Sequence, residues 1–450
     1  MQKNDRMAMM AELPEHEVLL RMSLPMMISF FIQAMYNIVD SMFVARISES
    51  ALTAVSLAFP MQQIVTAIAV GSATGVSAVW SRYMGQGEKE KAAQVIRTMT
   101  GMSLAFTALF IILGIFTSGP LFRLQTDVAE IAAMGTTYLT INWVLSCGSI
   151  FGKYYERLLV SSGRATLSMT AMASGAVFNL IFDPLLIFGY GPFPALGIAG
   201  AAYATVGGQI FAVFVAVALN WKFNDAVKHD MLKIAFHPYE AKEIMRVALP
   251  SIITMGLSSM TSFFINQILL AYSTTATAVY GVWMKLQNFC YMPTFGLNNG
   301  MVPILSYNYG TGRMDRVKKT MKIAVLGCAA LMSLLLIIFE IIPGTVLTMF
   351  SAGEKMREIG LWCLRACVIS LPFGAVSMIM STSMQALDHA RFSLVINLLR
   401  QCVLLIAAFG LLSLLTHSEK LIWFAVPLTE LITFAVAMLL NRRFRGHLGV

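Results

Sequence analysis

Residues 50–81 read SALTAVSLAFPMQQIVTAIAVGSATGVSAVWS, a run of 32 residues without a single charged side chain. A helix needs roughly 20 mostly apolar residues to cross the hydrocarbon core of a bilayer, so this stretch is long enough to span a membrane. Two further charge-free runs, each longer than the first, lie between Asp183 and Lys222 and between Arg246 and Lys285. The fold is therefore decided by helices that cross a lipid bilayer.

The overall composition supports a membrane protein and disfavours several other classes. Of the 450 residues, 57% are hydrophobic and only 12% are charged, whereas soluble proteins carry about 25% charged residues. A water-soluble enzyme, a disordered chain and a nucleic-acid binder are therefore disfavoured. The net charge of +9 comes largely from basic residues in short loops between apolar runs, which is a membrane pattern. The six cysteines lie inside apolar stretches without the spacing of a zinc site or a disulfide framework.

Splitting the apolar runs at their Gly, Pro and polar breaks predicts an all-α polytopic protein with twelve transmembrane helices. We expect these helices near residues 22–44, 52–79, 99–116, 131–151, 167–188, 197–219, 244–270, 276–305, 323–347, 359–384, 392–415 and 421–440. Residues 1–17 mix acids with bases and lack the order of a signal peptide, so the first span is expected to be retained.

The distribution of basic residues predicts the orientation of the chain. With twelve spans, 23 Lys and Arg residues fall on the side that carries both termini, and only five fall in the loops on the opposite side. Because Lys and Arg accumulate on the cytoplasmic side of membrane proteins, both termini are predicted to be cytoplasmic.

The second half of the chain also resembles the first half. The matching pairs are RMSLP at 21–25 with RVALP at 246–250, the G-x-x-x-G motifs at 71–75 and 296–300, Ser81 with Ser306, and the G-x-G motifs at 85–87 and 310–312. All these pairs share one constant spacing, and because six helices separate the copies, the repeat is parallel, with its axis along the membrane normal. The predicted domains are an N-terminal six-helix lobe at 1–220, a cytoplasmic linker at 221–243 and a C-terminal six-helix lobe at 244–450.

Two lobes of six helices on either side of a central path are the architecture of an alternating-access transporter. The sequence contains no phosphate-binding loop of the G-x-x-x-x-G-K-[ST] type and no H-E-x-x-H motif. Its six histidines form no triad or metal cluster. We therefore expect a transporter rather than an enzyme, with no cofactor.

Ionisable residues inside the spans are the candidates for function, because they are costly in lipid. Asp40 lies on the first span, with Tyr36 one turn earlier on the same face. Asp183 lies on the fifth span, with Asn179 one turn earlier and Pro184 directly after it. A carboxyl in such apolar surroundings could load and release a proton near physiological pH.

The repeat indicates that the fold itself does not require these two acids. In the register that pairs Pro25 with Pro250, Asp40 matches Ile265 and Asp183 matches Ala408. Since the helices were duplicated but the acid pair was not, coupling chemistry is predicted to belong to the N-terminal lobe.

The C-terminal lobe also carries charges inside its predicted spans, and several roles are compatible with them. By sequence, Lys285 and Glu430 are the most buried of these, and either could act as a gate, a substrate contact or one half of a paired charge. Arg365 and Arg400 lie near predicted span ends, where long basic side chains reach the membrane surface.

These features together resemble the multidrug and toxic compound extrusion (MATE) family. The resemblance covers nearly the whole chain and rests on Pro25, YNIVD at 36–40, AVSLAFP at 54–60, SRYMG at 81–85, NLIFDP at 179–184, GIAGAAYAT at 197–205, and residues 296–312 with Pro303 and NYG at 308–310. Within the family, the chain looks like the bacterial branch related to the DNA-damage-inducible F proteins.

The resemblance implies two six-helix bundles in the plasma membrane that export organic cations and other amphipathic drugs in exchange for H⁺ or Na⁺. It implies a cation-coupling site formed by Asp40, Asn179 and Asp183, with Tyr36 as a hydrogen-bond partner. It further implies a helix-6 threonine in the same network, for which Thr205 is the candidate.

In the same family comparison, Pro25 marks the bend of the first helix, and Pro184 is a second hinge candidate. We expect a proton-coupled exporter that acts as a monomer among membrane lipids, without a nucleic-acid partner. Two alternatives remain open. A Na⁺-coupled exporter would bind the ion at Asp183 and Asn179, and a lipid-linked oligosaccharide flippase would need several basic residues inside the spans.

Overall fold

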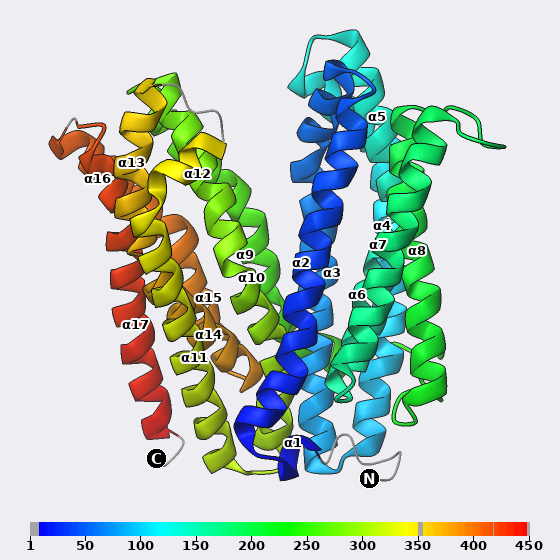
Figure 1. Cartoon of the computed structure of the whole chain (residues 1–450). Helices are drawn as coiled ribbons and strands as arrows, with labels where there is room; N and C mark the ends of the chain where they lie inside the picture. The colour runs from blue at the N-terminus through cyan, green and yellow to red at the C-terminus, as the bar shows by residue number, and fades with distance from the viewer. Residues whose placement is uncertain (1–8, 350–353, 417, 448–450) are drawn as a thin grey trace.

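The computed structural model describes residues 9–349, 354–416 and 418–447, and every regular element in these ranges is a helix. The N-lobe comprises α1 (Met9–Glu12), α2 (Glu15–Ala45), α3 (Glu49–Gln86), α4 (Lys89–Gln125), α5 (Ala129–Val144), α6 (Cys147–Ser161), α7 (Ala165–Phe188) and α8 (Ile198–Phe223). The C-lobe comprises α9 (Pro238–Leu270), α10 (Thr274–Gly310), α11 (Met314–Ile341), α12 (Pro343–Met349), α13 (Glu354–Val368), α14 (Leu371–Ala386), α15 (Ala390–Leu398), the π-helix η1 (Leu399–Val403), α16 (Leu404–Thr416), the short 3₁₀ helix η2 (Leu421–Phe424) and α17 (Ala425–His447). Figure 1 shows the two lobes as separate bundles.

The predicted all-α membrane fold with two six-helix bundles is confirmed. Among the described residues, nine helices are long and apolar enough to cross a membrane, and the pair α13–α14, bent by 44°, makes a tenth span. The interrupted pair α5–α6 and the less apolar α10 run beside these ten and complete twelve. α10 needs fewer apolar residues because it packs against helices of both lobes, so much of its surface faces protein rather than lipid.

Several helices extend beyond the predicted spans, and the fourth span shows what these extensions contain. It was expected at 131–151, but α6 continues to Ser161 and buries residues that sequence reasoning assigned to a loop. Arg157 is only 7% exposed, and its guanidinium donates to the carbonyl oxygen of Asn299 in the C-lobe, 3.3 Å away. A charged residue near the end of a helix can be buried when residues distant in the sequence supply its hydrogen bonds. Local hydropathy contains no information about such partners.

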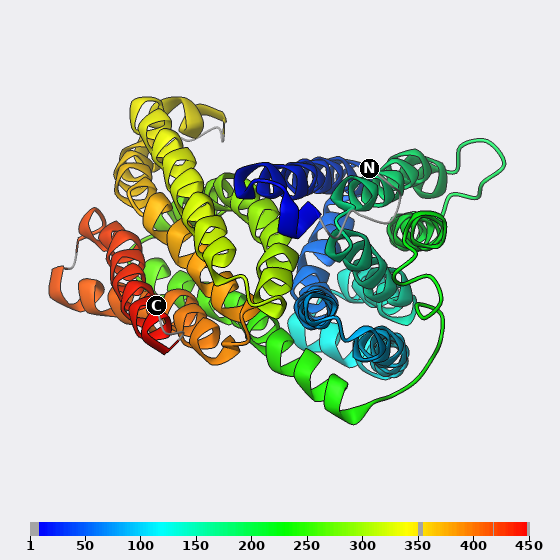
Figure 2. The ribbon, with the colours of Figure 1, turned by 90° about the horizontal axis from the view of Figure 1, so that it is seen from below.

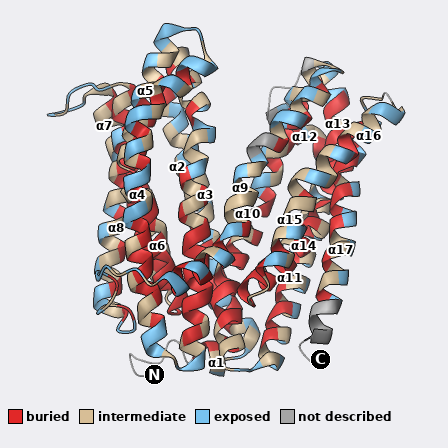
Figure 3. Cartoon of the chain, turned by 180° about the vertical axis from the view of Figure 1, so that it is seen from behind, coloured by how far each residue is buried: buried red, intermediate tan, exposed pale blue. Residues whose placement is uncertain are grey.

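The two lobes meet at one end and diverge towards the other. We call the meeting end the basal end; it carries α1 and the turns that join α3 to α4 and α10 to α11 (Figure 1). Figure 2, viewed from this end, shows the two bundles side by side. Buried residues gather where the lobes meet (Figure 3).

The repeated G-x-x-x-G motifs form the contact between the lobes. A Cβ atom added to Gly75 on α3 would lie 2.4 Å from the carbonyl oxygen of Ile244 on α9 of the other lobe. A Cβ atom added to Gly300 on α10 would lie 2.6 Å from the hydroxyl oxygen of Ser23 on α2. Each lobe therefore offers its glycine motif to the first long helix of the opposite lobe, and the small residues let the backbones approach closely.

The axis of the repeat passes through a second glycine pair at the basal end. A Cβ atom on Gly85 would lie 2.2 Å from the carbonyl oxygen of Tyr307, and one on Gly310 would lie 2.2 Å from that of Arg82. In the register of the repeat, Gly85 is the counterpart of Gly310, and Arg82 is the counterpart of Tyr307. The interface is thus nearly self-complementary, as expected when a two-fold axis relates the two surfaces.

Candidate functional site

The two acids singled out in the N-lobe lie side by side. Asp183 on α7 is completely buried, and Asp40 on the adjacent α2 is half-buried. The two carboxyl groups lie close enough for the charge of one to act on the other. Within the described residues, no Lys or Arg forms an ion pair with either acid. Two neighbouring carboxyls without a cation favour a shared proton or a bound cation, because like charges so close repel each other.

The local sequence of α7 positions the second half of this site. The Asn179 side-chain amide donates to Oδ1 of Asp183 across one helical turn, over 3.3 Å. Pro184 lies inside α7, which nevertheless continues to Phe188. Because proline has no N–H, the carbonyl of Leu180 loses its usual helical donor, which leaves an oxygen beside the acid. The residues predicted on the fifth span are therefore on one face of one continuous helix.

Four buried side-chain oxygens in this region have no hydrogen-bond partner among the described residues. They are Oδ1 of Asp40, Oδ1 of Asn179, Oδ2 of Asp183 and Oγ1 of Thr205. Buried polar atoms are normally satisfied, so oxygens left open in one lobe indicate a place for a proton, a water molecule or a cation.

The packing of α7 against α8 places Thr205 at the level of Asp183. A Cβ added to Gly208 would touch Asn179 at 3.2 Å, and one added to Gly200 would touch the carbonyl of Leu186 at 2.3 Å. Since the two helices run antiparallel, the positions between these contacts face each other. Thr205 therefore lies between these two contacts, near the level of Asp183.

Two tyrosines complete the surroundings of the acids. Tyr36 on α2 lies near Gln33, and Tyr138 on α5 lies near Gln62 on α3. Both phenols lie close enough to Asp40 and Asp183 to feel their charge. Sequence reasoning named Tyr36 but missed Tyr138 and the two glutamines. Glutamines inside otherwise apolar runs were the signal that could have revealed them.

The charges of the C-lobe are arranged differently. Glu430 on α17 is 5% exposed, and both its oxygens accept from Nε of Arg400, at 2.8 and 2.9 Å. Arg400 belongs to the π-helix Leu399–Val403 and lies over the Tyr291 ring, 5.3 Å from its centroid. The expectation that Arg400 reaches the membrane surface is wrong, because the buried carboxylate compensates its charge inside the lobe.

Lys285, expected to be buried, is exposed on α10. It precedes Gly296 by eleven residues, which is close to three helical turns, so both lie on one face of α10. That face contacts the N-lobe nearer the basal end, where a Cβ on Gly296 would lie 2.6 Å from Met27. Lys285 is thus on the side of α10 that faces the N-lobe, where the two lobes diverge.

The described residues contain no group of three or more His, Cys, Asp or Glu residues arranged to hold a metal ion. Two six-helix lobes related by a parallel repeat, with two neighbouring acids in one of them, are the architecture of a class of membrane transporters. The MatE family model matches residues 25–185 and 250–409, one match in each lobe. The chain belongs to the MatE family.

Named relatives align with almost the whole chain. An FAD transporter of Shewanella oneidensis is 27% identical over 425 residues, which cover 93% of this chain and 92% of that protein. The multidrug export protein MepA of Staphylococcus aureus is 22% identical over 449 residues, which cover 100% of this chain and 98% of that protein.

Solved structures share the fold. An outward-facing multidrug resistance MATE family transporter of the MOP superfamily superimposes with a TM-score of 0.90 at 22% identity, covering 98% of both chains. A MOP superfamily transporter of Pyrococcus furiosus, whose binding pocket is described as reversed in polarity, gives a TM-score of 0.89 at 22% identity, also covering 98% of both chains.

Proposed function

We propose that this protein is an antiporter of a bacterial plasma membrane that exports cationic amphipathic compounds in exchange for H⁺ by alternating access. The observation that carries the proposal is the pair of adjacent carboxyls in one lobe, the buried Asp183 and the half-buried Asp40, without a basic partner among the described residues. Membership of the MatE family and the names of the export proteins among its relatives support the transported class. Both termini are placed in the cytoplasm by the positive-inside rule, and the protein acts as a monomer.

The position of Asp40 on α2 connects the acid pair to the interface between the lobes. The lower part of the same helix carries Ser23 and Met27, which pack against the glycine motif of α10. Pro25 lies between these two contacts inside α2. Protonation of Asp40 or Asp183 neutralises the negative charge that binds the cation, α2 rearranges about Pro25, and the cation is released outwards. Deprotonation towards the cytoplasm restores the anionic site.

A second candidate substrate class is favoured by Lys285. A lysine on the side of α10 that faces the N-lobe suits an organic anion better than a cation, because it adds positive charge to the path between the lobes. The relative named as an FAD transporter is consistent with a phosphate-bearing flavin as cargo. Coupling to Na⁺ at Asp183 and Asn179 is the alternative for the driving ion.

Proteoliposomes test substrate and ion together. We expect a pH gradient to drive uptake of a cationic dye into vesicles that contain the parent protein, in the presence or absence of a Na⁺ gradient. Asp40→Asn and Asp183→Asn should each reduce this flux about tenfold or more, since neither amide can carry the coupling proton. Glu340→Gln is the matched control, because Glu340 lies near the end of α11 at the limit of pairing distance from an exposed Arg365.

The proton mechanism fails if both aspartate variants transport like the parent. Flux that follows a Na⁺ gradient and survives collapse of the pH gradient would replace H⁺ with Na⁺. Transport of FAD instead of the dye, with loss of that flux in Lys285→Ala, would replace the cationic cargo with an anionic one.

A further inference from the structure

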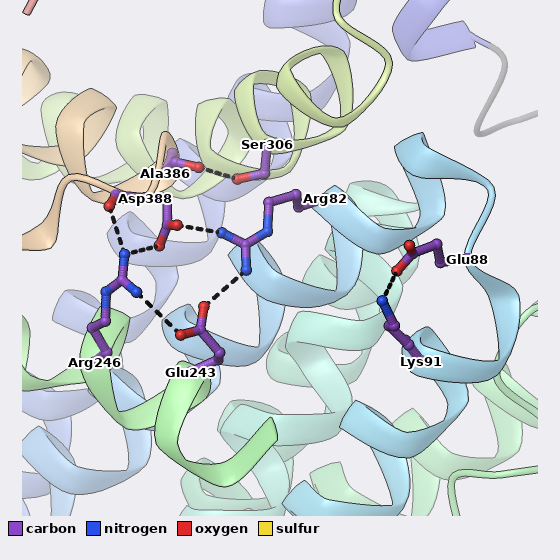
Figure 4. A network of polar contacts seen from close by, with 8 residues as sticks. All are labelled: Arg82, Glu88, Lys91, Glu243, Arg246, Ser306, Ala386 and Asp388. Atoms are coloured by element: carbon purple, nitrogen blue, oxygen red, sulfur yellow. Dashed lines mark hydrogen bonds and ion pairs between the residues drawn. The ribbon is translucent and has the colours of Figure 1, made fainter. Parts of the chain in front are cut away.

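A network of four charged side chains joins the lobes at the basal end. The guanidinium of Arg82, on α3 of the N-lobe, lies between two carboxylates of the C-lobe (Figure 4). It is 3.0 Å from Oε2 of Glu243 on α9 and 2.8 Å from Oδ2 of Asp388, which lies between α14 and α15. The three side chains are largely enclosed, with exposed fractions of 11%, 12% and 23%. Charge-assisted bonds of this kind are strong where water is largely excluded.

The second arginine of the network holds the two acids in place. Arg246 on α9 lies 3.1 Å from Oε1 of Glu243 and 2.9 Å from Oδ1 of Asp388, and it also donates to the Asp388 carbonyl oxygen. All three residues belong to the C-lobe, so they form a preassembled fork of carboxylates. Arg82 is the single member that comes from the opposite lobe, and it enters this fork.

The backbone at Asp388 is unusual. With φ of 69°, Asp388 is the only non-glycine residue of the described ranges in the left-handed region, where a Cβ is disfavoured. It is the residue that ends α14, since the N–H of His389 donates to the carbonyl of Met384 over 2.8 Å. The equivalent turn of the N-lobe has Gly163 with φ of 77°. The C-lobe thus has an aspartate at a position where the N-lobe has a glycine.

Two more charges of the network have no counterpart in the repeat. In the register of the repeat, Arg82 corresponds to Tyr307 and Glu243 corresponds to Val18. The turn that carries Asp388 is held close to the interface, because Ser306 on α10 donates to the carbonyl of Ala386 over 2.8 Å (Figure 4). Arg246 matches Arg21, but the equivalent place at the lobe interface lacks the counterparts of Arg82, Glu243 and Asp388, so only one of the two places carries the complete ionic network.

We propose that Arg82, Glu243, Arg246 and Asp388 form an ionic latch that holds the lobes together at the basal end and must open before the transporter can open there. The inference rests on the proposed alternating access, because only a protein that opens at this end needs a releasable contact. The latch lies beside the pair Gly85 and Gly310, where the backbones of the lobes are closest. Any separation of the lobes at this point withdraws Arg82 from the fork.

Two substitutions open the latch by different routes. Asp388→Gly removes both carboxylate contacts and restores the glycine of the repeat, so the left-handed turn becomes easier to form and the fold is retained. Arg82→Gln leaves the fork of the C-lobe intact and removes the only charge from the other lobe. Glu88→Gln is the matched control, since Glu88 pairs with Lys91 over 2.8 Å at the same end but within the N-lobe (Figure 4).

Distances between spin labels at the basal end report the state of the latch. Labels at Lys89→Cys on α4 and Lys319→Cys on α11, both exposed, are read in nanodiscs without substrate or ion gradient, with the native cysteines replaced. We expect one short distance in the parent and in Glu88→Gln. Asp388→Gly and Arg82→Gln should add a longer distance, with the ratio of open to closed molecules raised about tenfold.

The latch is refuted if both variants keep the distance distribution of the parent. Because this measurement involves neither coupling ion nor cargo, its result is separate from that of the transport assay. A lengthening in Asp388→Gly and Arg82→Gln alone supports the latch even if transport proves to be driven by Na⁺. Equal lengthening in Glu88→Gln would show a general effect of charge at this end and would overturn the proposal.

Discussion

At the scale of single residues, the two lobes differ in the partners of their ionisable side chains. The N-lobe places the half-buried Asp40 beside the buried Asp183, whereas the C-lobe pairs Glu430 with Arg400 inside the protein. By the repeat, Glu430 occupies the position of Thr205, at the level of the acid pair in the N-lobe. A carboxylate that already has an arginine needs no ion from solution. The C-lobe pair is therefore suited to fix the packing of its helices, whereas the acids of the N-lobe have no basic partner among the described residues and are available for the proposed coupling to protons.

Neutralising one member of the buried pair should destabilise the protein. Glu430→Gln leaves the Arg400 charge buried without its carboxylate, at a cost of about 3–5 kcal/mol. Replacing both residues with methionine should recover most of this stability, since a buried pair and apolar residues of similar volume are nearly equivalent. Thermal unfolding in detergent measures both variants. A double variant as unstable as the single one would contradict this account of the pair.

A second residue-scale prediction concerns Asp230 in the segment between the lobes. Burial alone would raise the pKa of this carboxyl, but hydrogen bonds from Arg97 and Lys233 outweigh burial and lower it below the ordinary value of 3.8. A lowered pKa stabilises the folded state above that ordinary value, and the stabilisation is lost as the pH falls through the folded pKa.

Asp230→Asn should therefore reduce stability at pH 7 by about 0.5–1 kcal/mol, a modest effect because the ion pairs lie at the protein surface, where Lys233 is exposed to solvent that screens charge. The difference from the parent should shrink below pH 3.8. Melting temperatures of both proteins across this pH range provide the measurement. An unchanged difference at low pH would show that lost packing, rather than lost charge, explains the effect.

At the scale of helices, the glycine motifs determine how closely the lobes approach. The motif of α3 packs on α9 and the motif of α10 packs on α2, so the two contacts are related by the repeat. Lipid gives no hydrophobic force between helices, and close packing of small residues takes its place. The interface between the lobes is therefore built on backbone proximity, with the ionic latch beside it.

A larger side chain at one of these glycines should force the lobes apart. Gly75→Val places a Cβ where the carbonyl of Ile244 already lies at 2.4 Å, and overpacking of this kind costs about 1–3 kcal/mol. Gly256→Ala, also in a spanning helix, is the matched control, because its Cβ would meet nothing within 4 Å. That change should be neutral or slightly stabilising. Equal melting temperatures for the two variants would exclude a close-packing role for Gly75.

At the scale of the whole molecule, the lobes are joined at the basal end and apart at the opposite end (Figure 1). The shape matches a solved outward-facing transporter of the family with a TM-score of 0.90. If the basal end faces the cytoplasm, as the distribution of basic residues predicts, the protein is in its outward-open state. Transport then requires the glycine contacts and the latch of Arg82 and Asp388 to separate, which links the proposed gate to the overall motion.

Much of the fold could be predicted from the sequence. The long uncharged runs, the internal repeat and its recurring motifs predicted two six-helix bundles, because lipid requires long apolar helices and a duplication leaves its spacing in the chain. The acids Asp40 and Asp183 were found in the same way, since charge inside an apolar run is rare.

Only the tertiary structure decided which side chains meet across helices. It brought Asp40 next to Asp183, which is distant in the sequence, and gave Arg400 a buried partner in Glu430. It placed Lys285 at the surface and Arg157 in the interior, against expectation from the sequence. Hydropathy and helical spacing are properties of neighbouring residues, so they determine where helices form and which way they cross. The partner of a buried charge depends on helices that are far apart along the chain, and only their packing determines it.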